Sequence, residues 1–162
     1  MSGGYWMIAA VGVVALVVIG FAWQKVRARV ERANYQRYRS EFHLHRERLE
    51  AKFVELAGNS GKPRGLRWTD CSFEDEVTYA RHRQNGELCA FVAVTIAFEA
   101  IEGGGMEEVE AVSNLRAATA VFRRDHGKWQ TDGRAIFNLN PTEAIAYYQD
   151  NLVLVGQEHA RT

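Results

Sequence analysis

The sequence predicts an α+β protein that is attached to a membrane by one N-terminal helix. An uncharged run at 5–23 precedes a long segment at 24–57 that has helical periodicity and contains neither Pro nor Gly. Alternating apolar residues on both sides of Asn85-Gly86 indicate an antiparallel hairpin. We therefore expect a single transmembrane helix, a long juxtamembrane helix packed on a four-stranded antiparallel sheet, and a small C-terminal helix.

The first element is the predicted membrane anchor at 5–23, which follows a short tail at 1–4. Its nineteen residues, YWMIAAVGVVALVVIGFAW, carry no charge. As a helix they would span about 28 Å, close to the roughly 30 Å hydrocarbon core of a bilayer. Tyr5 and Trp6 lie at one end and Trp23 at the other, as expected at two lipid–water interfaces. A cleaved signal peptide is disfavoured because no basic region precedes the run and no A-x-A-like site follows it.

The second element is a basic juxtamembrane helix at 24–41. Lys25, Arg27, Arg29 and Arg32 follow the anchor directly, whereas only the α-amino group lies on its other side. Because positive flanks stay on the cytoplasmic side, the sequence predicts an external N-terminus and a cytoplasmic soluble domain. We also expect these residues to contact anionic lipid headgroups.

The helix should continue from this basic segment to about residue 57, before a linker at 58–65. Its apolar residues recur at steps of three or four, and these are Val26, Val30, Tyr38, Phe42, His45, Leu49, Phe53 and Leu56. Such a stripe could cover the sheet, or it could pair with a second copy of the chain as a coiled coil. Its many aromatic residues favour covering the sheet.

The sheet should begin with a hairpin that turns at Asn85-Gly86, a dipeptide typical of two-residue type I′ turns. Pairing across this turn gives one apolar face and one mixed face, as in an antiparallel sheet with one covered side. The predicted apolar face contains Phe73, Val77, Tyr79, Val92, Val94 and Phe98. The predicted mixed face contains Glu74, Glu76, Thr78, His82, Cys89, Phe91, Thr95 and Glu99.

The remaining elements complete a soluble domain at 42–155. A third strand is expected within 109–124, a turn at His126-Gly127, and a fourth strand over 128–139. A helix then begins with Asn140 as its cap, Pro141 at its first position and Glu143 placed for a capping box. A short edge strand at 152–155 precedes a polar tail at 156–162. In outline this arrangement resembles the rolls of cystatin-like and nuclear-transport-factor-like domains, a likeness of layout that implies no function.

Charge is balanced over the chain but segregated along it. The 20 basic and 20 acidic residues argue against a dedicated nucleic-acid binder. Residues 24–52 hold nine basic and four acidic residues, whereas 69–110 hold two basic and ten acidic ones. The basic helix therefore faces either an anionic lipid surface or the acidic sheet.

No segment carries a catalytic, cofactor or metal motif, so we expect no catalysis, no cofactor and no metal. His43 and His45 point to different sides of a helix, and the glycine-rich segment at 102–110 lacks the ligand spacing of a calcium loop. Cys71 and Cys89 are expected to be free thiols too far apart to bridge. His82 should lie opposite Cys89, but without the third group that nucleophilic catalysis needs.

These observations favour a membrane-tethered interaction or scaffold protein, an accessory subunit whose partner is an unidentified membrane or cytoplasmic protein. A second hypothesis is a small-ligand-binding or enzymatic domain that uses a cavity between the sheet and its helix, where Tyr79, Asp75 and Thr119 are the polar candidates. A third is a structural subunit of an envelope-spanning secretion machine, because the single-span roll subunits of type IV secretion channels are similar in layout. That reading places the domain outside the cytoplasm, so topology separates it from the first.

Overall fold

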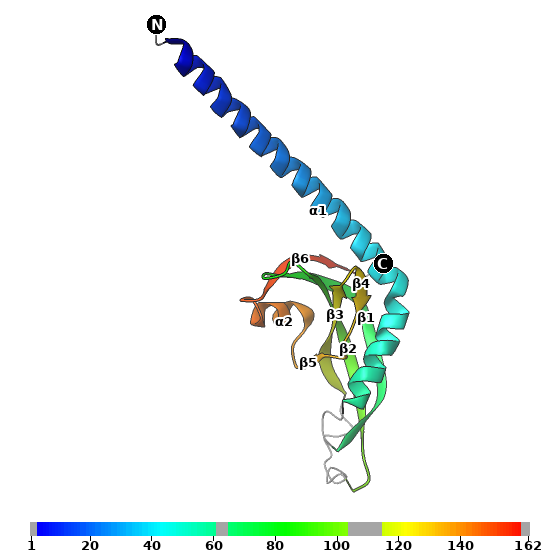
Figure 1. Ribbon diagram of the computed structural model, residues 1–162. Coiled ribbons are helices and arrows are strands. Elements are labelled where there is room, and N and C mark those ends of the chain that lie inside the picture. The colour runs from blue at the N-terminus through cyan, green and yellow to red at the C-terminus, as the bar shows by residue number, and fades with distance from the viewer. Residues whose placement is uncertain (1–2, 61–64, 104–114, 160–162) are drawn as a thin grey trace. The chain divides into compact units, whose positions relative to one another are not determined.

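The computed structural model describes residues 3–60, 65–103 and 115–159, with side chains from residue 18 onward except Ala28. Its order of elements, shown in Figure 1, is α1 (Gly3–Asn59), β1 (Leu66–His82), β2 (Leu88–Ala100), β3 (Arg116–Asp125), β4 (Lys128–Gln130), β5 (Ala135–Phe137), α2 (Pro141–Tyr147) and β6 (Leu152–Glu158). The chain forms two compact units, Met1–Leu44 and His45–Thr162.

The first unit consists of the N-terminal part of α1. Between Val18 and Val30 its large apolar side chains are strongly exposed, from 52% at Val30 to 73% at Trp23, whereas Phe42 near the end of the unit is buried. Within the described residues, no helix is long and apolar enough to cross a membrane. Most of the anchor predicted at 5–23 falls on residues 1–17, whose side chains lie outside the described part of the chain.

The second unit is an α+β domain built on an antiparallel sheet, as predicted. The strand order is β4-β3-β2-β1-β6, and β5 pairs with β3 beside β4, so the sheet has six strands where four were expected. The predicted fourth strand is interrupted between Gln130 and Ala135, where Gly133 has a φ of +74°. The predicted edge strand forms as β6 and extends to Glu158.

The hairpin between β1 and β2 corrects the turn predicted at Asn85-Gly86. The His82 amide donates to the Glu87 carbonyl at 2.8 Å, which leaves a loop of four residues, and the Gly86 amide closes it by donating to His82 at 2.9 Å. The amide of Arg83 donates to the carbonyl of Asn151 instead of entering the hairpin. The two-residue turn with positive φ at both positions is the one predicted at His126-Gly127, between β3 and β4.

The first face of the sheet packs against the C-terminal turns of α1. Phe53 is fully buried there, and its ring lies 5.7 Å from Phe73 and 6.0 Å from Phe122, centroid to centroid. Trp68 joins this cluster at 6.2 Å from Phe53 and 5.6 Å from Phe98. The predicted use of the helical stripe to cover the sheet is therefore confirmed for this part of the helix.

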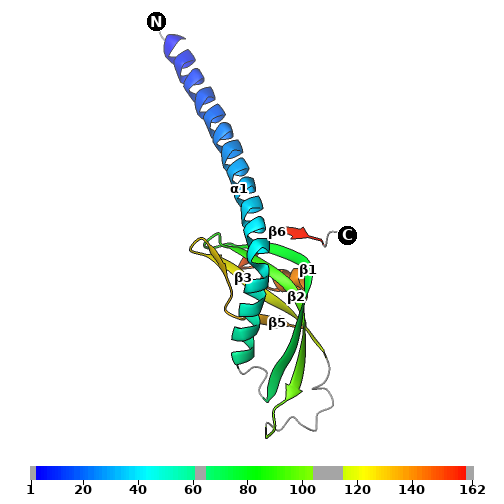
Figure 2. The same cartoon turned by 90° about the vertical axis from the view of Figure 1, so that its right-hand side faces the viewer.

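The second face of the sheet was expected to be solvated, but α2 covers one end of it. Ala144 and Ile145 of α2 form a second buried cluster with Cys89, Phe91 and Val121 of the sheet. Figures 1 and 2 show the sheet between α2 and the last turns of α1. The domain thus has three layers, and α2 creates a concave surface beside this cluster.

We expect residues 42–162 to fold without the preceding segment, because both buried clusters of the second unit lie within this range. The fragment should be soluble and should unfold cooperatively in a thermal melt followed by circular dichroism. A fragment of residues 60–162 is the control: it lacks Phe53 and should aggregate or lose cooperativity. Equal behaviour of the two fragments would contradict the assignment of α1 to the core.

Candidate functional site

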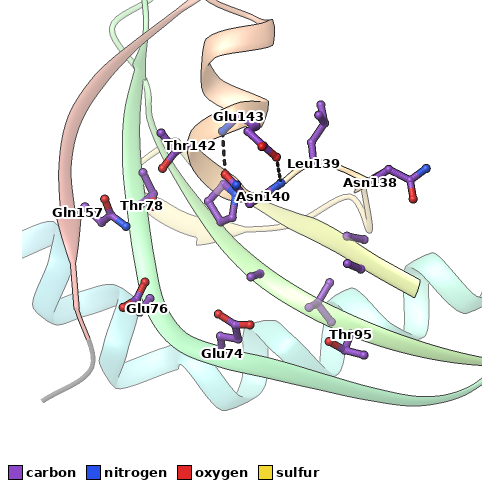
Figure 3. Close-up of a pocket in the computed structure, with 15 residues that line it drawn as sticks. Glu74, Glu76, Thr78, Thr95, Asn138, Leu139, Asn140, Thr142, Glu143 and Gln157 are labelled. Carbon is purple, nitrogen blue, oxygen red and sulfur yellow. Dashed lines mark hydrogen bonds between the residues drawn. The ribbon is translucent and has the colours of Figure 1, made fainter. Parts of the chain in front are cut away.

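A cavity of about 730 Å³ lies on the second face of the sheet beside α2. Its walls come from β1, β2 and β3, from the segment that leads into α2, and from β6, as Figure 3 shows. Ligand pockets for small molecules have volumes of about 300–1,000 Å³. The cavity therefore has the size of a small-molecule site and is open to solvent on one side.

A bend in β1 shapes the floor of the cavity. Phe73 pairs with Val94 and Val77 pairs with Val92, so the three residues between Phe73 and Val77 oppose Ala93 alone. Such an irregularity bends the strand and leaves backbone groups outside the ladder. Figure 3 shows the bend with Glu74 and Glu76 projecting from it.

Arg46 of α1 holds this bend from the other side of the strand. Its guanidinium donates to the carbonyl of Asp75 at 2.9 Å and to the carbonyl of Glu74. The same group forms a salt bridge with Glu50 at 2.6 Å, where the Arg46 side chain is only 15% exposed. One side chain thus satisfies the carbonyls that the irregular pairing leaves without a strand partner.

Three polar side chains of β1 face the cavity at alternate positions, Glu74, Glu76 and Thr78. Within the described residues, neither carboxylate has an ion-pair or hydrogen-bond partner. Thr78 is 1% exposed, and its hydroxyl makes no hydrogen bond to the described chain. Every fully enclosed polar side-chain atom in the described part of the chain has a hydrogen-bond partner. The Thr78 hydroxyl has none in that part, so it is not fully enclosed, and it borders the cavity.

The opposite wall is fixed by the start of α2. The Asn140 side chain accepts from the Glu143 amide at 2.9 Å, and Glu143 accepts from the Asn140 amide at 2.9 Å, which confirms the predicted capping box. The hydroxyl of the buried Thr119 donates to the carbonyl of Leu139 at 2.7 Å and ties this segment to the sheet. These hydrogen bonds tie the start of α2 to the sheet, and Leu139, Asn140 and Pro141 line the cavity from this wall.

The cavity carries negative charge with no compensating cation in its walls. Of the fifteen described residues that line it, Glu74, Glu76 and Glu143 are acidic and none is Lys, Arg or His. Apolar groups, including Ala93, Leu139 and Pro141, also line the cavity. The site thus combines acidic and aliphatic surface.

This cavity lies on the face of the sheet that α2 partly covers, whereas the sequence suggested a cavity between the sheet and the long N-terminal helix. Aromatic side chains pack between the sheet and the last turns of α1, and Tyr79 is buried with its hydroxyl donating to Glu158 at 3.1 Å. The hydroxyl of Thr119 donates to the carbonyl of Leu139 in the cavity wall, and Asp75 lies in the bend of β1. The alternation of the hairpin correctly placed Glu74, Glu76, Thr78 and Thr95 on one face. The approach of Asn138, Thr142 and Gln157 to the same cavity depends on how the turn after β5, α2 and β6 pack in the folded domain.

The two cysteines are free, as predicted, and lie on opposite faces of the sheet. Cys89 is opposite Ala80 and not His82, because the longer loop shifts the register by two residues. Burial raises the pKa of Cys89 to about 11, with a further rise from the carboxylate of Glu87, and burial likewise raises the pKa of Cys71 to about 11. Both thiols are protonated at neutral pH, which makes them poor nucleophiles.

The remaining sequence-predicted positions do not converge on a site in the described structure. No group of three or more His, Cys, Asp or Glu residues could hold a metal ion in the described ranges. Most of the glycine-rich segment at 102–110 lies outside them, as do the side chains of Tyr5 and Trp6. Trp23, Lys25, Arg27, Arg29 and Arg32 are all exposed on α1.

Comparisons of the chain with protein-family models, with curated proteins and with solved structures found no match.

Proposed function

We propose that the chain is a single-pass membrane protein whose α+β domain binds a protein partner, without catalysis of its own. The exposure of large apolar side chains on α1 carries this proposal. Val18, Ile19 and Phe21 are 59–64% exposed and continue the uncharged run that begins at Tyr5. A helix that presents such residues is stabilised by lipid or by an apolar partner, because exposed contiguous apolar surface is unfavourable in water.

The basic residues that follow support a membrane surface at this point of the chain. Lys25, Arg27, Arg29 and Arg32 are exposed on the same helix, directly after Trp23. Basic residues near an anionic leaflet each contribute about 1 kcal/mol of attraction. These basic residues lie on the C-terminal side of the uncharged run at 5–23. Because basic flanks stay in the cytoplasm, this arrangement favours an external N-terminus and a cytoplasmic domain.

The edge of the sheet offers a surface for a protein partner. β6 is an edge strand, and Val153, Leu154 and Val155 are 37–51% exposed on it. Val155 lies at an irregularity in the pairing with β1, since Gly156 pairs with Tyr79 and Leu154 pairs with Ala80. An exposed apolar edge strand is suited to adding a strand or an apolar surface from another chain.

Topology tests this proposal. The full-length chain with a C-terminal tag should remain in the membrane fraction after alkaline carbonate washing. In right-side-out spheroplasts the tag should resist added protease until the membrane is permeabilised. Release by carbonate would refute the anchor. A tag digested while a cytoplasmic marker stays intact would refute the cytoplasmic placement and favour the envelope-machine reading.

Neutralising the basic flank should weaken the preference for a cytoplasmic domain. With four Gln substitutions, at Lys25, Arg27, Arg29 and Arg32, we expect a substantial fraction of chains to become protease-sensitive. A matched control replaces four basic residues of the second unit, Arg48, Lys52, Arg67 and Arg123, and should keep the original topology. Unchanged protection of the flank variant would show that these side chains do not set the orientation.

The cavity beside α2 supports a second function for the same domain, the binding of a small ligand. The observation that favours it is the convergence of unpartnered polar groups, Glu74, Glu76 and Thr78, in a space of suitable size. The two functions are compatible, because β6 presents its exposed apolar residues at the sheet edge and the cavity lies on a face.

A further inference from the structure

We propose that the cavity beside α2 binds a small aliphatic amine, with its ammonium group held by Glu74, Glu76 and Thr78. This inference goes beyond the proposed membrane anchoring and does not depend on it. The second candidate function, binding of a small ligand, does not specify the ligand, and this proposal names its chemical class.

The charge of the cavity selects a cation. Glu74 and Glu76 project from the bend of β1 into a space whose fifteen described lining residues include no basic side chain. Two carboxylates on one face of a strand repel each other, and a positive ligand between them removes that repulsion. An anionic ligand would instead add a third like charge to this end of the cavity.

The buried hydroxyl of Thr78 indicates that the cavity is built for a hydrogen-bonding ligand. Thr78 is 1% exposed, and its hydroxyl has no partner in the described chain although it borders the cavity. An isolated acidic pair on a surface needs no ligand, because water solvates it. The Thr78 hydroxyl, two positions from Glu76 on the same face of β1, adds a directed acceptor, and an ammonium group has three donors to offer such acceptors.

The remaining walls favour an alkyl chain over a bare metal ion. Ala93, Leu139 and Pro141 are among the residues that line the cavity, and they offer apolar surface to methylene groups. Within the described ranges no three His, Cys, Asp or Glu side chains are placed to hold a metal ion. Glu143 lies on the opposite wall, so an amine with a second positive end also meets a carboxylate there.

The test measures binding of 1,5-diaminopentane to the full-length chain in a mild detergent by isothermal titration calorimetry. We expect saturable binding that weakens as the salt concentration rises, because the attraction is electrostatic. 1,5-Pentanediol has the same carbon chain without charge and should not bind. Equal binding of the diol, or no binding of the diamine, would overturn the proposal without affecting the membrane anchor.

Substitutions locate the binding site. Glu74→Gln and Glu76→Gln should each weaken diamine binding by about tenfold, because each removes a charged hydrogen-bond acceptor. Thr78→Val, which keeps the shape of the side chain, should weaken it less. The matched control is Glu47→Gln, an exposed glutamate of α1, and it should leave binding unchanged. Full binding by the Glu74→Gln/Glu76→Gln double variant would refute the assignment, and the diol comparison decides the matter if that variant does not fold.

Two further titrations separate the sources of the ammonium group. Nα-acetyl-lysine amide presents the same group as a protein side chain, and stronger binding of it than of the diamine would contradict a free small amine as the ligand. Magnesium and calcium chloride test the metal alternative. Competition of either ion with the diamine at lower concentration than the diamine itself would also overturn the proposal.

Discussion

Gly133→Ala is expected to lower the free energy of unfolding by about 3 kcal/mol, through a backbone collision and an unfavourable φ acting together. Gly133 has a φ of +74°, in the left-handed region that favours glycine. A Cβ atom added there would lie 2.6 Å from the Ala57 nitrogen and 2.9 Å from the carbonyl carbon of Leu56. Neither atom can move without displacing the last turn of α1, so the helix and the loop must separate.

Gly86→Ala is the matched control for this prediction. Its φ of +71° is nearly the same, but nothing lies within 4 Å of the added Cβ atom. We expect it to lose only about 1 kcal/mol from the left-handed conformation. Chemical denaturation of both variants measures the difference, which isolates the collision with α1. Equal losses would mean that Gly133 does not approach the helix closely.

Arg46→Met is expected to lower the free energy of unfolding by about 2 kcal/mol and to weaken amine binding in the cavity. The substitution keeps an aliphatic side chain but removes the donors to the carbonyls of Glu74 and Asp75, and it leaves Glu50 without its partner. Because Arg46 does not line the cavity, its effect on binding would act through the bend of β1.

The control for Arg46 lies two residues further along the same helix. Arg48→Met removes the same charge from an exposed position and should change stability by less than about 0.5 kcal/mol. Denaturation and diamine titration of both variants separate the role of Arg46 from a general loss of basic charge. Normal amine binding by Arg46→Met would show that the bend keeps its shape without the guanidinium.

Local sequence patterns predicted most elements of the domain, because each depends on residues close together in the chain. Asn140, Pro141 and Glu143 form a capping box from their spacing alone, and His126-Gly127 forms a two-residue turn between adjacent strands. The hairpin near Asn85-Gly86 differs from the prediction in its length, and the amide of Arg83 in its loop donates to the carbonyl of Asn151, which is distant in sequence. The register predicted next to the turn was wrong by two residues. Each residue still lies on the predicted face of the sheet, because side chains alternate with a period of two.

The cavity was less predictable, since its parts meet only in the folded domain. Alternation placed Glu74, Glu76 and Thr78 on one face, but nothing local indicated that α2 would cover part of that face. A charged residue at Asp75, on the side expected to be apolar, was the available signal of the bend in β1. Its stabilisation by Arg46, 29 positions earlier in the chain, could not be read from either segment alone.

The bend in β1 also determines how this strand tolerates insertions and deletions. Three residues stand opposite Ala93 where a regular ladder would have one, so the bend contains a surplus pair of residues. Removing two residues there would straighten the strand and abolish the acidic floor, yet every residue on either side would keep its face. Removing one would invert the strand from Phe73 toward Trp68 relative to the rest. Length changes at this position therefore follow a parity rule, under which a binding surface can be gained or lost while the hydrophobic layers stay in place.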